Sequence, residues 1–524
     1  MHGPRHIALI GCGFTGTSAF YQLVENYPVK EISIFEASGV FGPGFPYQED
    51  ECPDYLINNT TDTMCLAPSN RRAFLNWLER HREYAPDLDA QGHLPRSVYG
   101  AFLKDVFAST LTLAAVKGVA VRLVGHEATV MREDGDGVHI GWEGGDITAD
   151  MAILTTGRCP DVGVEMDKAP RARVIQNHIM SDAFDDIALD ATVHVLGASL
   201  SAYDVVNRLF SPQSGCRFEA SDNGALKFMP GANNRSVVLC SRSGRLKAVT
   251  SRAPMAITRK HFTIDALRQA AQEKPLTLDD VAQMISRDAK DNGVELDWPA
   301  MVEPYAACRS GEEVNTRAGI LLEAAILAAT APKSSAGNFL VDFAQHALMD
   351  IWDAFAENLL SAEAEKLYRA KVETAALCYA AACPASTAQK LLALHRAGRL
   401  RVVRGVSDVR VGEGGDFAIH HAHGVEPASI LVNATGGVDR KLASNGQPAL
   451  IKSLVATGLL APYARAGAIA HGAAVDMKTF RAIGAKNIYL ANMLLWGPGF
   501  FTSSAYLMAS VVERLLKAAF EKPS

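Results

Sequence analysis

A glycine-rich turn near the start of the chain constrains the fold more than any other feature. It reads GCGFTG over Gly11–Gly16 and follows the apolar run Ile7–Ile10, which is typical of a buried parallel strand. A segment with helical spacing, Ser18–Glu25, comes next, and a second strand, Glu31–Phe35, then ends at Glu36. Strand, glycine turn, helix and strand in this order predict a βαβ unit at the beginning of the chain.

Each glycine of this turn has a role in dinucleotide binding. Gly11 permits a tight turn after the strand, Gly13 lets the backbone approach a pyrophosphate, and Gly16 lets the helix pack closely against the strand. The start of the helix presents free N–H groups and the positive end of its dipole to the phosphates. Glu36 can accept hydrogen bonds from ribose hydroxyls. The alternative is a glycine turn in an unrelated α/β protein, which the terminal acid disfavours.

A second unit of the same kind begins near Ala191. The apolar run Thr192–Leu196 leads into the turn Gly197–Ala202, with the sequence GASLSA, and Tyr203–Leu209 continues as a helix. Ser236–Cys240 is the next strand. Only the first glycine of the motif is kept, so this turn alone is a weaker signal of a nucleotide site than the first one.

The residues around the second turn favour NADPH. The hydroxyls of Ser199 and Ser201 can donate hydrogen bonds to a phosphate. Arg242 occupies the place of the carboxylate that would select NADH, and Arg245 and Lys247 follow closely. Because the forked guanidinium suits a 2′-phosphate, we expect NADPH rather than NADH. A solvated basic loop is the alternative.

The two units share a further pattern. Each glycine turn is followed, after more chain, by four short runs with strand character and a Thr-Gly pair, which ends at Gly157 in the first unit and at Gly436 in the second. We interpret each set of runs as a β-meander. The runs are Val119–Val124, Ala128–Arg132, Val138–Trp142 and Met151–Thr155, and then Leu400–Val403, Ser407–Val411, Phe417–His420 and Ser429–Val432.

These patterns predict an α/β fold with two nested Rossmann-like (βαβ) nucleotide-binding domains, β-meanders and a helical insertion. Thr263–Pro384 has almost no strand signal, and its helix starts include Thr277, followed by Asp280, and Ser361. Ala505–Ala519 has the spacing of a closing helix. The predicted parts are 1–165 with 446–524 for the first nucleotide-binding domain, 190–262 with 385–445 for the second, and 263–384 for an insertion that can cover a substrate site.

Composition excludes several functional classes. The net charge is −6 without long charged runs, which disfavours a nucleic-acid groove or a basic membrane-docking face. The nine cysteines contain no Cys-x-x-Cys pair, so neither a metal site nor a redox dithiol is expected. No run reaches the ~18 apolar residues of a membrane span, and no signal segment is evident, which favours a cytoplasmic location. The oligomeric state stays open.

Three further segments carry a resemblance to a known family. They are FGPGFPY over Phe41–Tyr47, LINN over Leu56–Asn59 and PRSVYG over Pro95–Gly100. With the glycine turns and the Thr-Gly pairs, they make the chain similar to the two-dinucleotide flavoproteins, which include class B flavin monooxygenases and N-hydroxylases. More narrowly, the chain resembles the bacterial FAD-NAD(P)-binding family, which contains amino-acid N-monooxygenases of the nitrosuccinate-synthase type. The stretch from Ala491 to Phe500 is similar to the return segment that contacts the flavin in such enzymes.

The resemblance implies FAD in the first domain and NADPH in the second. It places Gly44, Tyr47 and Asn58 near the flavin, in segments that reach Met64. The predicted cofactor-binding residues are Gly11, Gly13, Phe14, Thr15, Gly16, Glu36, Gly44, Tyr47, Asn58, Met64, Gly157, Gly197, Ser199, Ser201, Arg242, Gly436, Asn492 and Phe500.

Two departures from the family pattern bear on the chemistry. Asn59 and Thr60 replace the usual Pro-Ala, and the Phe-x-Gly-x-x-x-His fingerprint of monooxygenases is matched only faintly by Val174 to His178. We therefore do not expect Baeyer–Villiger chemistry, and we interpret His178 as a structural histidine.

The resemblance implies a flavin-dependent monooxygenase that uses NADPH and O2 to N-hydroxylate a small amine or amino acid through a C4a-hydroperoxide of the flavin. No catalytic side chain is assigned, since the flavin carries the redox chemistry. Arg252, Arg259 and Lys260 lead into the helical insertion and could bind an anionic substrate, with a solvated basic turn as the alternative. A flavoprotein reductase or dehydrogenase that uses NAD(P)H, and a non-catalytic FAD-binding protein, are the alternative functions.

Overall fold

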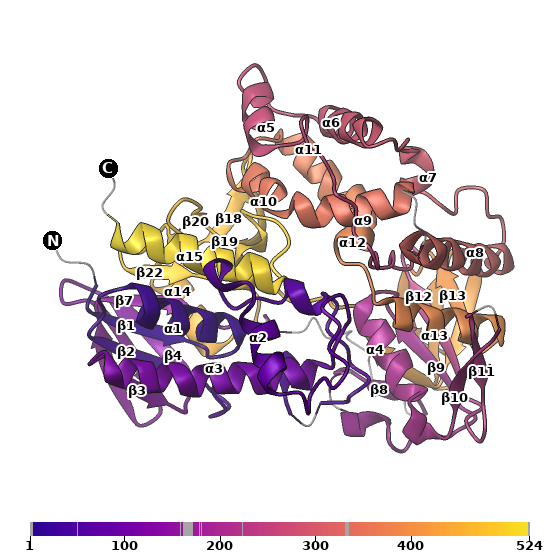
Figure 1. The fold of residues 1–524 in the computed structure, drawn as a ribbon, viewed down its shortest axis with the longest axis horizontal. Coiled ribbons are helices and arrows are strands. Elements are labelled where there is room, and N and C mark those ends of the chain that lie inside the picture. Colours follow the sequence, from indigo (N-terminus) through magenta and orange to yellow (C-terminus); the bar gives the residue numbers. More distant parts are fainter. Residues whose placement is uncertain are drawn as a thin grey trace.

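The computed structural model describes residues 4–49, 51–157, 159–160, 171–177, 179, 181–222, 224–330 and 335–521. Two sheets lie apart along the longest axis, and a group of helices lies to one side of them (Figure 1). The first sheet takes its strands from the beginning and the end of the chain, and the second from the middle. This is the predicted α/β fold with two nested Rossmann-like units, called here the first and the second domain.

Five parallel strands form the core of the first sheet, in the order β22-β7-β1-β2-β3. Strands β1, β2 and β7 are buried almost throughout, as expected for apolar parallel strands covered on both faces. Two short antiparallel strands, β20 and β21, extend the edge beside β22. The bounds are β1 His6–Ile10, β2 Glu31–Phe35, β3 Ala120–Val124, β7 Met151–Leu154, β20 Val475–Asp476, β21 Arg481–Ala482 and β22 Ile488–Leu490.

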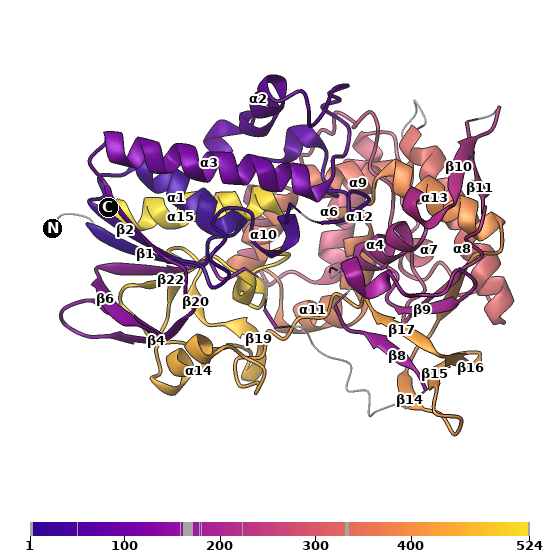
Figure 2. The same ribbon diagram turned by 90° about the horizontal axis from the view of Figure 1, so that it is seen from below.

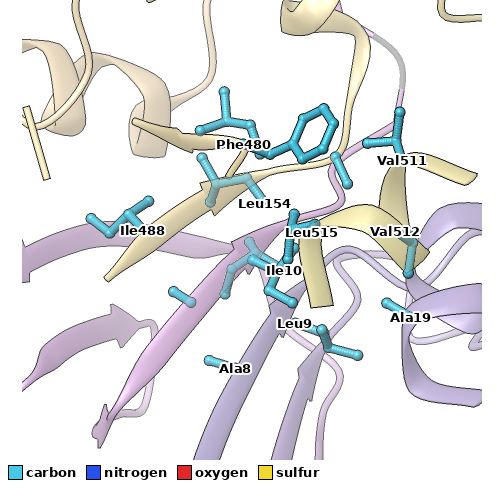
Figure 3. Close-up of a cluster of buried hydrophobic side chains, with 14 of the residues drawn as sticks. Ala8, Leu9, Ile10, Ala19, Leu154, Phe480, Ile488, Val511, Val512 and Leu515 are labelled. Carbon is cyan, nitrogen blue, oxygen red and sulfur yellow. The ribbon is translucent and has the colours of Figure 1, made fainter. Parts of the chain in front are cut away.

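Helices α1, α3 and α15 cover one face of this sheet, and a β-meander with helix α14 lies on the other (Figure 2). Leu9 and Leu154 of the strands and Leu515 of α15 are fully buried in the hydrophobic core of this domain (Figure 3). The predicted closing helix is confirmed and is one residue longer than expected. The bounds are α1 Phe14–Asn26, α3 Arg96–Val116, α14 Ala449–Ala456 and α15 Ala505–Phe520.

The second sheet repeats the arrangement of the first, in the parallel order β8-β17-β9-β12-β13. Strand β9 leads into α4 as β1 leads into α1, and helices α8 and α13 pack beside β13. The bounds are β8 Arg173–Ile175, β9 Thr192–Leu196, α4 Leu200–Leu209, β12 Ser236–Ser241, α8 Gly311–Thr330, α13 Ala385–Arg396, β13 Leu400–Arg404 and β17 Ile430–Asn433.

The predicted β-meanders are right only for the inner runs. In each set the first and last runs, β3 with β7 and β13 with β17, belong to the parallel sheet. Each meander is completed by a strand that the sequence analysis missed, β6 or β16, because their polar, largely exposed residues lack an apolar run. The bounds are β4 Ala128–Glu133, β5 Val138–Trp142, β6 Gly145–Ala149, β14 Asp408–Val411, β15 Phe417–His421 and β16 Gly424–Ala428.

The described part of the predicted insertion is helical, and both predicted helix starts are confirmed. Thr277 and Asp280 form a reciprocal capping box, and the hydroxyl of Ser361 accepts from the N–H of Ala364. No helix among the described residues is both long and apolar enough to cross a membrane. The bounds are α5 Ile264–Ala271, α6 Leu278–Asp291, α7 Trp298–Val302, α9 Ala336–His346, α10 Leu348–Ala356, α11 Ala362–Leu367, a π-helix Tyr368–Val372 and α12 Glu373–Ala380.

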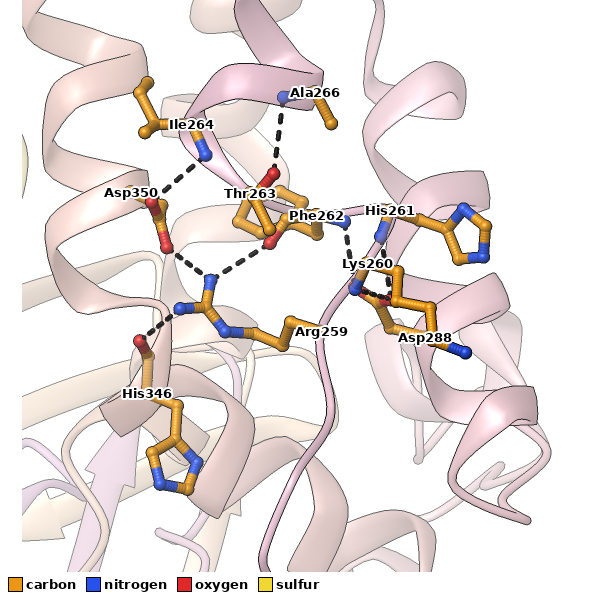
Figure 4. Close-up of polar contacts among 10 residues, drawn as sticks. All are labelled: Arg259, Lys260, His261, Phe262, Thr263, Ile264, Ala266, Asp288, His346 and Asp350. Carbon is orange, nitrogen blue, oxygen red and sulfur yellow. Dashed lines mark hydrogen bonds and ion pairs between the residues drawn. The ribbon is translucent and has the colours of Figure 1, made fainter.

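The loop that enters the insertion is held by one buried carboxylate. Asp288 of α6 accepts hydrogen bonds from the backbone N–H groups of Lys260, His261 and Phe262, at 2.8 to 2.9 Å (Figure 4). The side chain of Asp288 is fully buried. A carboxylate that accepts from three successive backbone N–H groups fixes the conformation of this loop, and the buried N–H of Phe262 would otherwise lack this partner.

We expect Asp288→Ala to open this loop. Loss of the shared acceptor should cost about 3 kcal/mol locally, so amide hydrogen exchange at residues 260–262 should accelerate by about two orders of magnitude. Asp291→Ala is the matched control, since Asp291 forms only exposed ion pairs with Lys260 and His261. Equal exchange in both variants would contradict the role of Asp288.

Candidate cofactor sites

The turn between β1 and α1 is packed so tightly that two of its positions require glycine. Gly11 has a φ of 102°, and a Cβ on it would lie 2.7 Å from the carbonyl oxygen of Thr155. A Cβ on Gly16 would lie 2.0 Å from the carbonyl oxygen of Gly11. The N–H of Gly11 donates to the carbonyl of Phe35 at 2.9 Å, which ties the turn to β2. The tight turn and the close helix packing expected of these glycines are both present.

The segment Phe41–Tyr47 crosses over this turn. Gly44 has a φ of 65°, and a Cβ on it would lie 2.6 Å from the Cα of Gly13. The N–H of Gly42 donates to the carbonyl of Cys12 at 2.9 Å. Gly13 is the N-cap of α1, and no side chain caps that helix. The first N–H groups of α1 are therefore available to an anionic ligand.

Glu36 is fixed beside the turn by three hydrogen bonds. Its Oε2 accepts from the N–H of Cys12 at 2.9 Å, and its Oε1 accepts from the N–H and the hydroxyl of Ser38 at 3.2 and 2.8 Å. These contacts hold the carboxylate at the end of β2, in the position expected for a ribose acceptor.

A cavity of about 220 Å³ opens where these elements meet. Its walls include Gly11, Glu36, Gly157 and Asn492, four of the predicted cofactor-binding residues. Asn492 is buried, and its amide donates to Oγ1 of Thr156 at 3.1 Å, which joins the return segment to the end of β7. The cavity therefore collects residues from three distant parts of the chain around the glycine turn.

Helices α1 and α15 run parallel, so their N-termini face the same end of the first domain. Near their C-terminal ends the rings of Tyr27 and Phe520 lie 4.6 Å apart, and midway the amide of Gln22 donates to the carbonyl of Ala509. Thr502, just before α15, is 4% exposed, and its Oγ1 makes no hydrogen bond with any described residue. The N-termini of α1 and α15 carry partial positive charge, and the hydroxyl of Thr502 has no hydrogen-bond partner among the described residues. Both features suit a negatively charged ligand.

The remaining residues predicted near the flavin form two groups. The ring of Tyr47 lies 5.2 Å from that of Tyr99, which lies 6.2 Å from that of Phe14, and Met64 is buried in the same cluster. Phe500 stacks on an aromatic ring of the helical insertion, with 5.4 Å between centroids. The structure therefore brings Phe14, Tyr47 and Met64 together and places Phe500 at the boundary with the insertion.

The Pro95–Gly100 motif joins the two domains. A Cβ on Gly100 would lie 1.9 Å from the carbonyl oxygen of Tyr47, so a side chain there would displace the loop over the glycine turn. Arg96 forms a largely buried ion pair with Asp204 of α4, with 2.6 Å between Nη2 and Oδ2. Burial raises the pKa of Asp204, and Arg96 opposes that rise. The sequence analysis did not find this pair, because its members lie far apart in the chain.

The second turn repeats the geometry of the first. Gly197 has a φ of 128°, its N–H donates to the carbonyl of Cys240 at 2.8 Å, and a Cβ on it would lie 2.3 Å from the carbonyl oxygen of Ala434. Ser199 is the N-cap of α4 without a side-chain capping bond, so its hydroxyl is not committed to the helix. A Cβ on Gly436 would lie 3.9 Å from Oγ of Ser201, which places these two residues side by side.

Only one of the three basic residues after β12 remains available to a phosphate. Lys247 is buried, its Nζ donates to the carbonyl of Leu377 at 2.8 Å, and burial lowers its pKa. Arg245 donates to the carbonyl of Val302 at 2.9 Å. Arg242 is exposed. Arg242 is therefore the better candidate for a 2′-phosphate, since Arg245 and Lys247 both donate to backbone carbonyls.

The second turn faces the first domain. A small cavity between the domains is lined by Leu56 and Asn58 of the first and by Leu200 and Tyr203 of the second. Leu200 is the first residue of α4. The start of the second nucleotide turn's helix thus lies beside Asn58, a residue predicted to lie near the flavin.

The predicted substrate residues lie just before the insertion, and Arg259 and Lys260 form ion pairs with it. Arg259 pairs with Asp350 and donates to the carbonyls of Phe262 and His346 (Figure 4). Lys260 pairs with Asp291 at an exposed position. The prediction of Arg259 as a substrate ligand is not retained, because its donors are already engaged. Arg252 is exposed, and its N–H donates to the carbonyl of Ala329.

His178 lies outside the described residues. Within the described residues, no group of three or more His, Cys, Asp or Glu side chains could hold a metal ion.

Residues 8–159 match the protein family described as FAD-NAD(P)-binding. A curated relative is the uncharacterized protein YdhS of Escherichia coli, 23% identical over 283 residues, which are 52% of this chain and 51% of that protein. The chain thus spans about half the length of the curated relative that it matches.

Two solved structures share the fold over nearly the whole chain. L-lysine 6-monooxygenase from Pseudomonas syringae is 13% identical with a TM-score of 0.52, covering 98% of this chain and 99% of the other. The FAD-bound cadaverine monooxygenase DfoA from Erwinia amylovora is 13% identical with a TM-score of 0.50, covering 98% and 94%. The family match over residues 8–159 agrees with the predicted FAD and NAD(P) cofactors, and the two solved structures share the predicted fold.

Proposed function

We propose that the protein is a flavin-dependent monooxygenase that uses NADPH and O2 to hydroxylate the nitrogen of a small amine or amino acid. The observation that carries the proposal is that Asn58, predicted to lie near the flavin, lines one cavity with Leu200, the first residue of α4 after the second nucleotide turn. Hydride transfer needs the nicotinamide and the flavin to approach closely, and this arrangement supports that approach. The fold shared with the lysine and cadaverine monooxygenases agrees with the proposal.

FAD, when bound, would supply the redox chemistry with NADPH and oxygen. The chain's own residues would bind and orient the cofactor and shield the reacting centre from water. The turn Gly11–Gly16 and the free N–H groups of α1 hold a diphosphate, and Glu36 accepts from a ribose. The N-terminal end of α15 and the hydroxyl of Thr502 would favour a ligand group with negative charge. The aromatic side chains of Tyr47 and Phe500 exclude water from the reacting centre.

Chemistry at a protein thiol is not part of the proposal. All nine cysteines are free. Burial raises the pKa of Cys12, within the glycine turn, to about 12. A redox-active thiol needs a lowered pKa and exposure, and Cys12 has neither.

The test is NADPH oxidation by the FAD-loaded protein in air, with a panel of amines and amino acids, followed by mass spectrometry. We expect one substrate to accelerate NADPH oxidation and to gain one oxygen atom. Hydrogen peroxide is measured in parallel, because uncoupled turnover also consumes NADPH. NADPH oxidation that is independent of oxygen and leaves every amine unchanged would replace this proposal with a reductase.

Arg242 is expected to select NADPH over NADH. Arg242→Ala should lower kcat/KM for NADPH about 10- to 100-fold, the effect of losing charge-assisted hydrogen bonds to the 2′-phosphate. The same variant should keep its kcat/KM for NADH, which lacks that phosphate. Stopped-flow reduction of bound FAD by each nucleotide measures both values, and equal losses with the two nucleotides would contradict the assignment.

A further inference from the structure

Two arginine side chains contact the last part of the return segment, Trp496–Phe500. Arg369, in the π-helix between α11 and α12, donates from Nη2 to the carbonyls of Trp496, Gly497 and Gly499, at 3.0 to 3.4 Å. The guanidinium of Arg440, which follows the second Thr-Gly pair, lies 4.2 Å from the ring centroid of Trp496. The helical insertion and the connection between the domains therefore meet on this segment.

Three buried polar atoms at this meeting point make no hydrogen bond with any residue that the structure describes. They are Nη1 of Arg369, Oε1 of Glu373 and Nε of Arg440. Nη1 of Arg369 and Oε1 of Glu373 lie 3.6 Å apart, which is too long for a hydrogen bond. Buried polar groups in folded proteins nearly always have partners, so open donors and an open acceptor at one place indicate a missing ligand. We call Arg369, Glu373 and Arg440 the polar cluster.

The polar cluster lies next to the cofactor cavity and reaches solvent. Arg440 interacts electrostatically with Cys159, which lines that cavity, and with Glu373. The side chains of Arg369 and Glu373 keep 23% and 18% of their exposure, so one edge of the cluster is open. The π-helix that carries Arg369 is a rare local geometry that often occurs at functional sites.

Arg369 forms ion pairs with Glu365 at 3.1 Å and with Glu373 at 3.6 Å, whereas Arg440 forms no ion pair with any described residue. Burial raises the pKa of Glu373, and this rise is opposed by Arg369 and Arg440. Burial also lowers the pKa of Arg440. Removing charged groups from water is costly unless partners replace the lost hydration. A ligand that brings charges of both signs would supply those partners.

We propose that the polar cluster binds the charged groups of an amino-acid substrate, with the ammonium on Glu373 and the carboxylate on Arg440 and Arg369. This inference rests on the proposed function and narrows its substrate class. The donors and the acceptor match a zwitterion, because an anion alone would leave Oε1 of Glu373 without a hydrogen bond. A diamine without a carboxylate would leave Nη1 of Arg369 and Nε of Arg440 without hydrogen bonds, so amino acids should bind more tightly than diamines.

The test measures binding separately from turnover. Isothermal titration calorimetry of the FAD-loaded protein is carried out with each of the protein amino acids, with L-ornithine, and with cadaverine as a probe without a carboxylate. Glu373→Gln and Arg440→Gln keep the approximate volume and remove the charge. Glu363→Gln is the matched control, since Glu363 is an exposed residue of α11. Bound FAD and NADPH affinity are measured in every variant.

We expect at least one amino acid to bind, and cadaverine to bind at least about tenfold more weakly. Glu373→Gln and Arg440→Gln should each raise the dissociation constant of that amino acid at least about tenfold, with FAD content and NADPH affinity unchanged and with Glu363→Gln like the wild type. Unchanged amino-acid affinity in both cluster variants overturns the inference, and so does a parallel loss of FAD. Amino-acid binding to the polar cluster without oxygen insertion would instead overturn the proposed function alone.

Discussion

Replacing Gly44 by alanine is expected to cause a large loss of affinity for FAD. Gly44 has a φ of 65°, and its new Cβ would lie 2.6 Å from the Cα of Gly13, a backbone atom that can move only if the glycine turn moves. With a ψ of −174°, Gly44 has a conformation that is essentially restricted to glycine and costs alanine about 1–3 kcal/mol, and overpacking adds about 1–3 kcal/mol. The displaced turn should therefore weaken FAD at least about hundredfold, which corresponds to ~3 kcal/mol.

Gly39→Ala separates the two causes. Gly39 has a φ of 71°, close to that of Gly44, but no atom lies within 4 Å of a Cβ built on it. This variant carries the conformational cost alone and should keep its FAD. The ratio of flavin to protein absorbance after purification, followed by titration of the apoprotein with FAD, compares the two variants. Equal FAD affinity in Gly44→Ala and the wild type would show that the diphosphate does not lie on this turn.

Replacing Arg96 by alanine is expected to have the second large effect. Arg96 and Asp204 are 13% and 7% exposed, and they join α3 of the first domain to α4 of the second. Removing the arginine leaves a buried carboxylate without its counter-ion, which typically costs about 3–5 kcal/mol. The contact between the domains should loosen, so the thermal midpoint should fall and NADPH should reduce the bound FAD more slowly.

Two comparisons make this prediction specific. Lys104→Ala removes a more exposed ion pair with Glu49 from the same helix, and it should change stability by no more than about 1 kcal/mol. The double replacement Arg96→Met with Asp204→Leu removes both charges and should recover much of the stability, since no buried charge is left. A thermal midpoint for Arg96→Ala equal to that of Lys104→Ala would show that the pair does not hold the domains together.

The sequence predicted the parts of the fold that are local. The glycine turn, the strand before it and the acid after the next strand lie within residues 7–36, so their spacing carries the geometry directly. The fifth strand of the first sheet, β22, could not be placed, because its partner β7 lies more than 300 residues earlier in the chain. The outer runs were assigned to meanders for the same reason, since strand neighbours are set by tertiary packing.

The candidate site could likewise be predicted only where its residues belong to sequence motifs. Gly11, Glu36, Gly157 and Asn492 do line one cavity, as a motif-based reading implies. Arg259 looked like a free cation in the sequence, but Asp350, 91 residues later, engages it. Arg440 and Glu373 carried no sequence signal, because an open hydrogen-bonding atom is visible only once the chain around it is folded.

Because the second sheet is formed by the middle of the chain and the first by both of its ends, the two sheets are completed at different times during translation. All strands of the second sheet lie between residues 173 and 433, whereas the first sheet needs β22 at residues 488–490 and is covered by α15. During translation the second sheet can therefore finish folding before β22 has been synthesised, while the first sheet is still incomplete. A nascent chain stalled before residue 488 should resist protease over the second sheet and remain cleavable near β1, so flavin loading becomes a late event.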